Sequence, residues 1–276
     1  MPELPEVETI ARQLSLVLKK RKIIDLRLID PKLRDFPHEK LRNKELLQLR
    51  RSGKEILFIF SNNIFLRVHL RMTGRLVWVA GKNRLDSSSI LVRKGVSDLR
   101  PKSIRAEFIF DGGTLFFEDV RRFGTIKIGF ESVEENWIDP ITDQFTVDVL
   151  TKLLQNSKQQ IKTWLLRQDK LVGIGNIYAS EILFRAGIHP NRSAGSLKKE
   201  EIKKLHLATV YILNKAIELN GTTFSDYRDS EGEAGAFQKF LAVYNREAEK
   251  CRKCKSKIIC IKQGQRSTYF CRHCQK

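Results

Sequence analysis

Apolar residues recur at helical spacing near the start of the chain. Pro5 suits the first turn of a helix, and positions three and four apart share one helical face. The residues on that face are Val7, Ile10, Ala11, Leu14, Val17 and Leu18. The pattern predicts an amphipathic helix that ends at the basic run 19–22. Packed on a sheet, such a helix would fix the N-terminus in space.

Residues 23–130 alternate between short apolar runs and turn sequences. The run 56–60 pairs with 64–69 across Ser-Asn-Asn, and the run 106–110 pairs with 114–117 across Asp-Gly-Gly. Both are typical of β-hairpins. Several short strands with turns between them predict a sandwich or a barrel. The polar stretch 81–103 is expected to be partly a loop.

The periodicity becomes helical after an acidic segment that ends in Asp139-Pro140. Helices are predicted over 146–154, 158–168, 176–186 and 198–220, with a short one over 236–243. The chain is therefore expected to be an α+β multidomain protein. We expect an N-terminal β-sandwich domain flanked by helices, a linker, a helical domain, a loop-rich region and a cysteine-rich end, at 1–130, 131–140, 141–220, 221–250 and 251–276.

The charge of the chain indicates which class of partner it binds. Lys and Arg number 51 against 32 Asp and Glu, a net charge of +19. Such a surplus favours a polyanionic partner, most simply nucleic acid. The apolar fraction of 41 % argues against disorder. No apolar run approaches the ~20 residues of a membrane span, and charges interrupt any signal peptide, so we expect a cytoplasmic protein with reduced thiols.

Four of the five cysteines form two pairs near the C-terminus. Cys251-x2-Cys254 and Cys271-x2-Cys274 have the spacing of a tetrahedral site with four thiolate ligands. We expect one zinc ion, which is structural because no coordination position stays open. Cys260 is interpreted as a packed thiol. Residues 251–276 contain eight basic residues and no acidic one, which suits contacts with phosphates.

The first three residues offer a nucleophile. Met1 precedes a small residue, so we expect its removal to leave Pro2 with a free secondary amine. An α-amine titrates near pH ~7.7–8.0, against ~10.4 for lysine, so more of it is neutral at pH 7. Such an amine attacks an aldehyde-like carbon to form an iminium, with Glu3 beside it as general acid or base. Taken alone, both residues are also common at helix starts.

The run from Pro2 to Thr9 resembles the N-terminal signature of the formamidopyrimidine-DNA glycosylase family, and the resemblance extends to Cys274. It implies a DNA glycosylase and AP lyase that excises oxidised purines, such as 8-oxoguanine and formamidopyrimidines, from double-stranded DNA. Pro2 would attack C1′, Glu3 would transfer protons, and β,δ-elimination would cleave the abasic site. The resemblance also implies a helix-two-turns-helix element at residues 173–181. We expect a monomer in the bacterial cytoplasm.

The resemblance also assigns roles to residues outside the N-terminus. A flipped-out base leaves a hole in the duplex that must be filled. The resemblance implies that Lys54 and Arg266 are catalytic residues beside Pro2 and Glu3. Lys54 and Arg266 would also hold phosphates. The implied DNA-binding residues are Asn176, which is also predicted to cap the helix after it, the void-filling set Met72, Arg121 and Phe123, and His69 as a structural hydrogen-bonding residue.

The sequence departs from the family at several positions. Arg71 and Asn245 stand where glycine is usual, and the acidic loop 225–236, which in the family covers the flipped base, is the least certain match. Two alternatives stay open. One is an endonuclease VIII-type glycosylase for oxidised pyrimidines. The other is a non-catalytic zinc-finger DNA-binding protein, which would need no free amine at Pro2.

Overall fold

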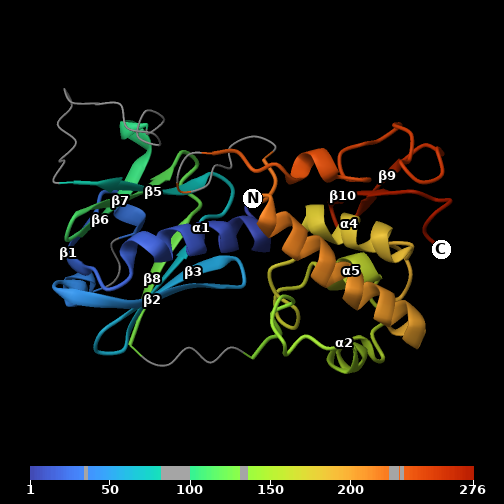
Figure 1. Cartoon of the computed structure of the whole chain (residues 1–276), viewed down its shortest axis with the longest axis horizontal. Coiled ribbons are helices and arrows are strands. Elements are labelled where there is room, and N and C mark those ends of the chain that lie inside the picture. Colours follow the sequence, from blue (N-terminus) through green and yellow to red (C-terminus); the bar gives the residue numbers. More distant parts are fainter. Residues whose placement is uncertain (34–36, 82–99, 131–135, 224–229, 231–232) are drawn as a thin grey trace. The chain divides into compact units, whose positions relative to one another are not determined.

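The computed structural model describes residues 1–33, 37–81, 100–130, 136–223, 230 and 233–276. The chain forms two compact units (Figure 1). The first combines Met1–Glu134 with Leu219–Ala236, and the second combines Glu135–Glu218 with Phe237–Lys276. Most of the predicted loops 81–103 and 225–236, and half of the predicted linker 131–140, lie outside the described residues.

The first unit begins with the predicted helix, α1 (Leu4–Leu18). A capping box starts it: the Glu3 carboxylate accepts the Glu6 N–H, and Glu6 Oε2 accepts the Glu3 N–H at 2.8 Å. This reciprocal pair satisfies two of the free donors that every helix start exposes. The predicted apolar face is buried except at Val17, and it packs on the sheet as expected.

Eight antiparallel strands build the rest of this unit. In chain order they are β1 (Lys22–Leu28), β2 (Lys44–Ser52), β3 (Glu55–Phe60), β4 (Ile64–His69), β5 (Gly74–Ala80), β6 (Ile104–Phe110), β7 (Gly113–Asp119) and β8 (Thr125–Gly129). They pair in the order β5-β7-β6-β1-β2-β3-β4-β8. The ladder folds over at β1–β2 into two layers, with β5, β6 and β7 in one and β2, β3 and β8 in the other (Figure 1). The predicted sandwich is confirmed, and its core lies between the layers.

The second unit is mainly helical. It contains α2 (Val147–Leu154), α3 (Ile161–Leu165), α4 (Asn176–Ala186), α5 (Lys199–Glu218) and the hairpin of β9 (Ile259–Gln263) and β10 (Arg266–Phe270). Among the described residues, the 3₁₀ turns of both units are η1 (Pro31–Leu33), η2 (His38–Leu41), η3 (Pro101–Ser103), η4 (Ala194–Ser196) and η5 (Phe237–Phe240). In the described part of the chain, no helix is long and apolar enough to cross a membrane.

Two predicted helices are shorter than expected. The helix predicted over 158–168 is reduced to α3 because Gln160 pairs with Ser193 in an isolated β-bridge instead of starting a helical turn. The helix predicted over 236–243 is only the turn η5. There the N–H groups of 242–244 bond to the Glu181 carboxylate, so they cannot continue a helical ladder.

The two departures from the family's glycines occupy left-handed backbone. Arg71 has φ 54° and Asn245 has φ 57°. Glycine adopts this region without a Cβ penalty, asparagine tolerates it, and arginine is disfavoured there. Glycine, which the resemblance implies at these positions, would meet no such penalty.

Arg71→Gly is expected to raise the free energy of unfolding of the first unit by about 0.5–1 kcal/mol, because it removes the strained Cβ. Asn245→Gly should gain less. Urea unfolding followed by tryptophan fluorescence measures both. Arg71→Ala is the matched control, since it removes the same charge but keeps the Cβ. If Arg71→Ala stabilised the protein as much as Arg71→Gly, the charge and not the backbone would be responsible.

Candidate functional site

The N-terminus is held firmly in the first unit. Pro2 is buried directly before α1, and Glu3 is only 4 % exposed. Glu6 joins this end to a distant turn, because its Oε1 accepts the Thr222 N–H at 2.7 Å. Gly221 makes room for this contact: with φ 78°, a Cβ there would lie 2.7 Å from Glu6 Oε1. The N-terminus, which the sequence predicts to carry the nucleophile, is thus held by α1 and by the turn of Thr222.

An ion pair ties α1 to the hairpin that carries Lys54. Arg51, whose side chain is 3 % exposed, donates from Nε to Glu8 at 2.8 Å and from a terminal nitrogen to the Gly53 carbonyl at 3.1 Å. Gly53 has φ 58° in the two-residue turn between β2 and β3, a conformation that glycine supplies. Lys54 is buried in the same turn.

His69 lies at the same end of the sheet as Lys54. It pairs with Glu55 and with Thr125 on the neighbouring strands, and its Nδ1 accepts the Arg71 N–H at 3.0 Å. Burial lowers the pKa of His69 to about 4, and the charges of Arg71 and Lys54 act in the same direction. The ring is therefore neutral at pH 7, which suits a hydrogen-bonding role rather than proton transfer.

Met72, Arg121 and Phe123 come together on the surface of the first unit. Arg121 lies between the other two: its terminal nitrogen is 3.2 Å from the Met72 sulfur, and its guanidinium carbon is 4.8 Å from the Phe123 ring centroid. Met72 is 46 % and Phe123 is 51 % exposed. These apolar side chains belong to turns, not to the core, so they are available to an incoming partner.

A buried carboxylate that sequence reasoning missed organises these turns. Asp119 is 1 % exposed and accepts bonds from the Thr73 hydroxyl, from the Arg121 N–H at 3.2 Å and from the Gly124 N–H at 2.7 Å. It therefore fixes the turn of Met72 and the turn of Phe123 together. The available signal was an aspartate that ends an apolar strand two residues before the Arg-Arg-Phe-Gly segment begins.

A second missed pair holds the same turn from the other side. Arg122, at φ 57°, donates to both oxygens of Asp30, at 2.6 and 2.5 Å. These bonds, with the charge of Arg122, lower the pKa of Asp30 to about 2. The pair therefore stays ionised at neutral pH. It connects residues 92 positions apart, which local pattern does not reveal.

In the second unit, the structure corrects the predicted role of Asn176 as a helix cap. Gly175 is the N-cap of α4, and Asn176 is the first helical residue. Its Nδ2 instead donates to the Ser267 carbonyl at 3.0 Å. The side chain reaches across to β10 because the hairpin packs against the start of α4. Asn176 is thus tied to the residue next to Arg266, which is exposed at the start of β10.

Lys162 was not singled out from the sequence, yet it is 1 % exposed. Its Nζ donates to the same Ser267 carbonyl at 2.9 Å and to the Thr268 hydroxyl at 2.7 Å. A buried lysine is stable only when its charge is well hydrogen-bonded. Here it fixes β10 on α3. The sequence signal was only its position within the helix predicted over 158–168.

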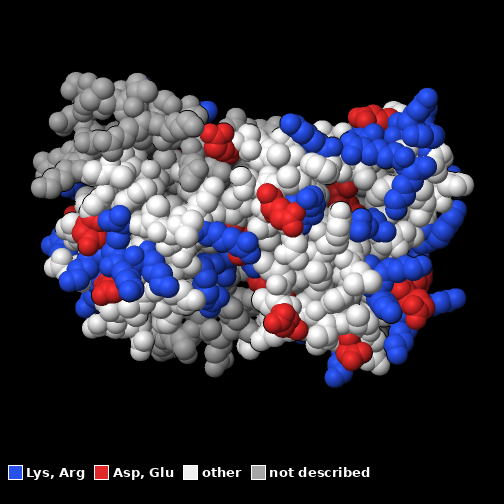
Figure 2. Space-filling model, in the orientation of Figure 1, with Lys and Arg blue, Asp and Glu red and all other residues white. Residues whose placement is uncertain are grey.

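The turn that presents Arg266 has left-handed φ values at both central residues, Gly264 at 53° and Gln265 at 62°. This is the signature of a two-residue type I′ hairpin turn. Basic side chains gather over this hairpin at the right of the view, as Figure 2 shows. The sequence prediction of a basic hairpin is confirmed by the pairing of Arg266 with Gln263.

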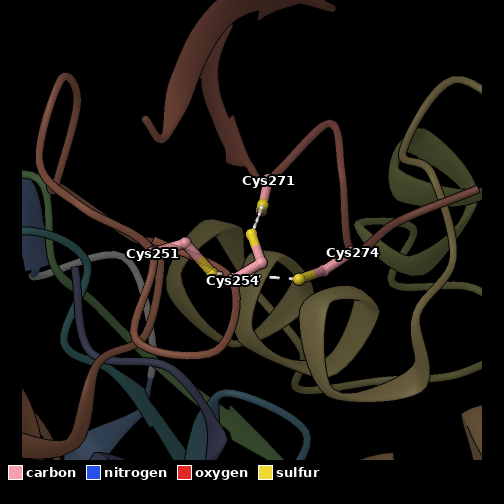
Figure 3. A group of neighbouring side chains, drawn as sticks. All are labelled: Cys251, Cys254, Cys271 and Cys274. Carbon is pink, nitrogen blue, oxygen red and sulfur yellow. Dashed lines mark hydrogen bonds between the residues drawn. The ribbon is translucent and has the colours of Figure 1, made fainter. Parts of the chain in front are cut away.

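The four predicted cysteines converge from the two knuckles (Figure 3). Their sulfur atoms all lie within 4.8 Å of one another, with Cys251 3.9 Å from Cys274 and Cys254 3.4 Å from Cys271. A tetrahedral site with Zn–S bonds of about 2.3 Å separates its sulfurs by about 3.8 Å. The cluster is therefore positioned to bind one zinc ion. Cys260 lies outside it, on β9.

The chemistry of the thiols also suits a cation. Hydrogen bonds from Ser256 lower the pKa of Cys254 to about 6, whereas burial and the neighbouring thiols raise that of Cys274 to about 12. Four thiolates cannot share this space without a positive charge among them. The zinc would supply that charge and hold the two knuckles together, and it would leave no coordination position for substrate.

Glu181 was also missed as a structural element. It is 2 % exposed on α4 and accepts the N–H groups of Ala242, Val243 and Tyr244 at 2.8, 3.0 and 2.8 Å. Burial raises its pKa although the three donors oppose that shift. This carboxylate positions the segment that leads into the first zinc knuckle.

The two units define a class: a two-unit protein with a β-sandwich, a helix-two-turns-helix element and a basic four-cysteine finger. Family models agree along the chain. Residues 1–126 match the formamidopyrimidine-DNA glycosylase N-terminal domain, 138–228 match its H2TH domain, and 248–276 match the zinc finger found in FPG and IleRS. The chain belongs to the formamidopyrimidine-DNA glycosylase family.

Individual relatives match over their full length. A formamidopyrimidine-DNA glycosylase of Pelotomaculum thermopropionicum is 39 % identical over 100 % of this chain and 99 % of its own. The Fpg (MutM) of Lactococcus lactis in complex with DNA that contains N7-benzyl-Fapy-dG has a TM-score of 0.85 at 32 % identity, with both chains fully covered. The same enzyme with DNA that contains an oxidised pyrimidine has a TM-score of 0.85 at 31 % identity, again over both whole chains.

Proposed function

We propose that this protein is a base-excision-repair DNA glycosylase and AP lyase that removes oxidised purines from double-stranded DNA. The observation that carries the proposal is the match of all three family models along one chain, together with a buried Pro2 directly before a capped helix. The non-catalytic zinc-finger alternative gives no reason for the first unit to hold its N-terminus so firmly. A cytoplasmic, DNA-associated monomer fits this activity.

The proposed reaction begins at the Pro2 amine, once Met1 is removed. The amine nitrogen forms a bond to C1′ of the flipped nucleotide while the glycosidic bond breaks and the base leaves with a proton. The C1′–O4′ bond then breaks and O4′ takes up a proton, which opens the sugar ring and leaves the nitrogen, having lost its own proton, as an iminium. The iminium acidifies the C2′ hydrogen, whose loss breaks the C3′–O bond, and a second elimination breaks the C5′–O bond. Water then releases the free amine. The strand is left with a gap that carries phosphates at both ends.

Glu3 is the proposed proton-transfer group, and Lys54, Asn176 and Arg266 are the proposed phosphate contacts. Lys54 is held in a two-residue turn, and Asn176 is tied through the Ser267 carbonyl to the residue that follows Arg266. Such rigid donors suit phosphate binding because little side-chain order has to be gained on contact. His69 supports the Lys54 end of the sheet.

Oxidised pyrimidines are a second candidate substrate class. The observation in its favour is the Lactococcus lactis enzyme, whose structure was determined with DNA that contains an oxidised pyrimidine. Borohydride trapping on matched duplexes tests the proposal directly. We expect a covalent adduct with 8-oxoguanine duplex and no adduct with undamaged duplex. A stronger adduct with an oxidised pyrimidine would make that class the main substrate, and no adduct with any lesion would contradict the proposed lyase.

Glu3→Gln is expected to lower base excision by at least ~10²-fold, the scale of general acid–base groups. The amide keeps the size of the side chain and can still accept the Glu6 N–H, so α1 should stay intact. Single-turnover release of 8-oxoguanine measures the chemistry, and affinity for a lesion duplex serves as the control. Excision at the wild-type rate would remove Glu3 from the mechanism.

Phe123→Ala is expected to weaken binding of a paired lesion duplex more than binding of an abasic analogue. Filling the hole offsets the unstacking of a base, which amounts to a few kcal/mol, and an abasic site requires less unstacking. Since Phe123 is half exposed, the truncation should leave the melting temperature unchanged. Equal losses of affinity on both duplexes would show that Phe123 does not fill the void.

A further inference from the structure

A hollow of about 360 Å³ lies on the second unit. Three elements line it: the last turn of α4, the middle of α5 and the first zinc knuckle. Its lining residues are Arg185, Lys204, Leu207, Ala208 and Lys253. Three of these five are cations and none is acidic, so the hollow combines positive charge with an apolar floor.

Aromatic rings hold two of the cations in place. The Arg185 guanidinium lies 3.5 Å from the centroid of the Tyr211 ring, and Lys253 Nζ lies 4.9 Å from that of Phe184. Such contacts fix position but do not neutralise charge. Within the described ranges, no ion pair involves either of these cations or Lys204. The hollow therefore presents uncompensated positive charge on partly ordered side chains.

The floor of the hollow is apolar and open to solvent. Leu207, which lines the hollow, is 57 % exposed, and Tyr211, which lies outside the lining, is 48 % exposed. They stand four residues apart on α5 and so share one face of the helix. Exposed apolar surface rimmed by charge is typical of a protein interaction site, and interfaces are enriched in tyrosine and arginine.

The hollow and the proposed phosphate contact of α4 lie at opposite ends of that helix. Asn176 is its first residue and Arg185 its last but one. Nine residues at about 1.5 Å each separate them by about 14 Å along the axis. A phosphate held at Asn176 is thus out of reach of Arg185, and binding at the two places can be measured separately.

We propose that this hollow docks an acidic peptide segment of a protein partner that carries an apolar side chain. Carboxylates would meet Arg185, Lys204 and Lys253, and the apolar side chain would cover Leu207. A DNA backbone offers only phosphates and sugars, which leave the apolar floor unused. Arg185 covers one face of the Tyr211 ring, so that face is not open to stacking by a base. Charge and shape together favour the peptide.

The test uses a fluorescein-labelled peptide of aspartates around a central Leu-Phe pair. A peptide with serine in place of Leu-Phe and an oligothymidine of equal charge are the comparisons. We expect the wild-type full-length protein to bind the Leu-Phe peptide more tightly than the serine peptide, as measured by fluorescence anisotropy. An oligothymidine affinity that falls as much as the peptide affinity when the cations of the hollow are changed would overturn the proposal in favour of a nucleic-acid surface.

Two charge-matched variants locate the binding. The triple variant Arg185→Glu, Lys204→Glu, Lys253→Glu should weaken peptide binding by about tenfold or more. The control Lys152→Glu, Lys158→Glu, Lys203→Glu changes exposed lysines of the same unit outside the hollow and alters the net charge equally. It should retain most of the affinity. Equal losses in both would mean non-specific attraction to a chain of net charge +19.

Leu207→Ser keeps the proposal testable if the triple variant does not fold, because the side chain is exposed and its loss should not affect stability. It should weaken the Leu-Phe peptide and leave the serine peptide unchanged. Duplex binding and borohydride trapping should be unaltered in this variant. An unchanged affinity for the Leu-Phe peptide would show that the apolar floor does not take part.

Discussion

Protein that retains Met1 is expected to give no borohydride-trapped adduct with 8-oxoguanine duplex and no strand cleavage. With Met1 attached, the Pro2 nitrogen belongs to a peptide bond, whose resonance removes its nucleophilicity. Protein made while methionine aminopeptidase is inhibited supplies this form. Mass spectrometry of the N-terminal peptide reports the fraction processed, so that activity can be plotted against the amount of free Pro2.

Pro2→Gly tests the contribution of the proline ring while a terminal amine is kept. It keeps a terminal amine, now primary, in place of the secondary one, so a reduced activity should remain. Both forms should still bind lesion duplex, because the proposed phosphate contacts lie elsewhere in the chain. The trapped adduct should map to the N-terminal peptide. Full lyase activity with Met1 retained, or an adduct on an internal lysine, would contradict the assignment of Pro2 as nucleophile.

Sequence pattern predicted the parts of this fold that depend on local periodicity. The face of α1 was readable because its apolar residues recur every three or four positions, and the burial of Leu14 and Leu18 follows from that. The hairpin of β6 and β7 was readable because a turn sequence separates two apolar runs. The four zinc ligands were readable because a tetrahedral site imposes a spacing of its own.

Contacts between distant segments were not predictable in this way. Nothing near Asn176 in the sequence shows that its amide bonds to Ser267, 91 positions away, and so its role as a helix cap was the natural but wrong prediction. The same holds for Asp119, which joins two turns, and for Lys162, which is buried against β10. These side chains are set by tertiary packing, which overrides local preference.

The resemblance to the family was needed where residue type alone favours an ordinary structural role. Met72 and Phe123 would be taken as core residues from their apolar character alone. The structure places them on exposed turns, with Arg121 between them. Their proposed role is therefore supported by geometry that periodicity does not contain.

Cys271→Ser is expected to lose zinc, to disorder the finger and to abolish DNA binding. The hairpin of β9 and β10 with its two knuckles is too small to bury an adequate core, so its order depends on the metal. Structural zinc contributes about 10–16 kcal/mol of folding free energy in small finger peptides. Zinc content and the thermal melt of the full-length protein measure the loss.

Arg266→Ala is expected to weaken phosphate binding without affecting zinc binding. Arg266 is exposed on a type I′ turn and offers no ligand to zinc, so zinc content and melting temperature should stay at wild-type values while DNA affinity falls. If it neutralises one phosphate, the slope of log affinity against log salt should shrink by about one unit.

Lys257→Ala, which removes one charge from the finger away from the turn, is the matched control. A salt slope that changes equally in both variants would mean that Arg266 adds only general charge, and an unchanged slope in Arg266→Ala would show that this arginine does not hold the backbone.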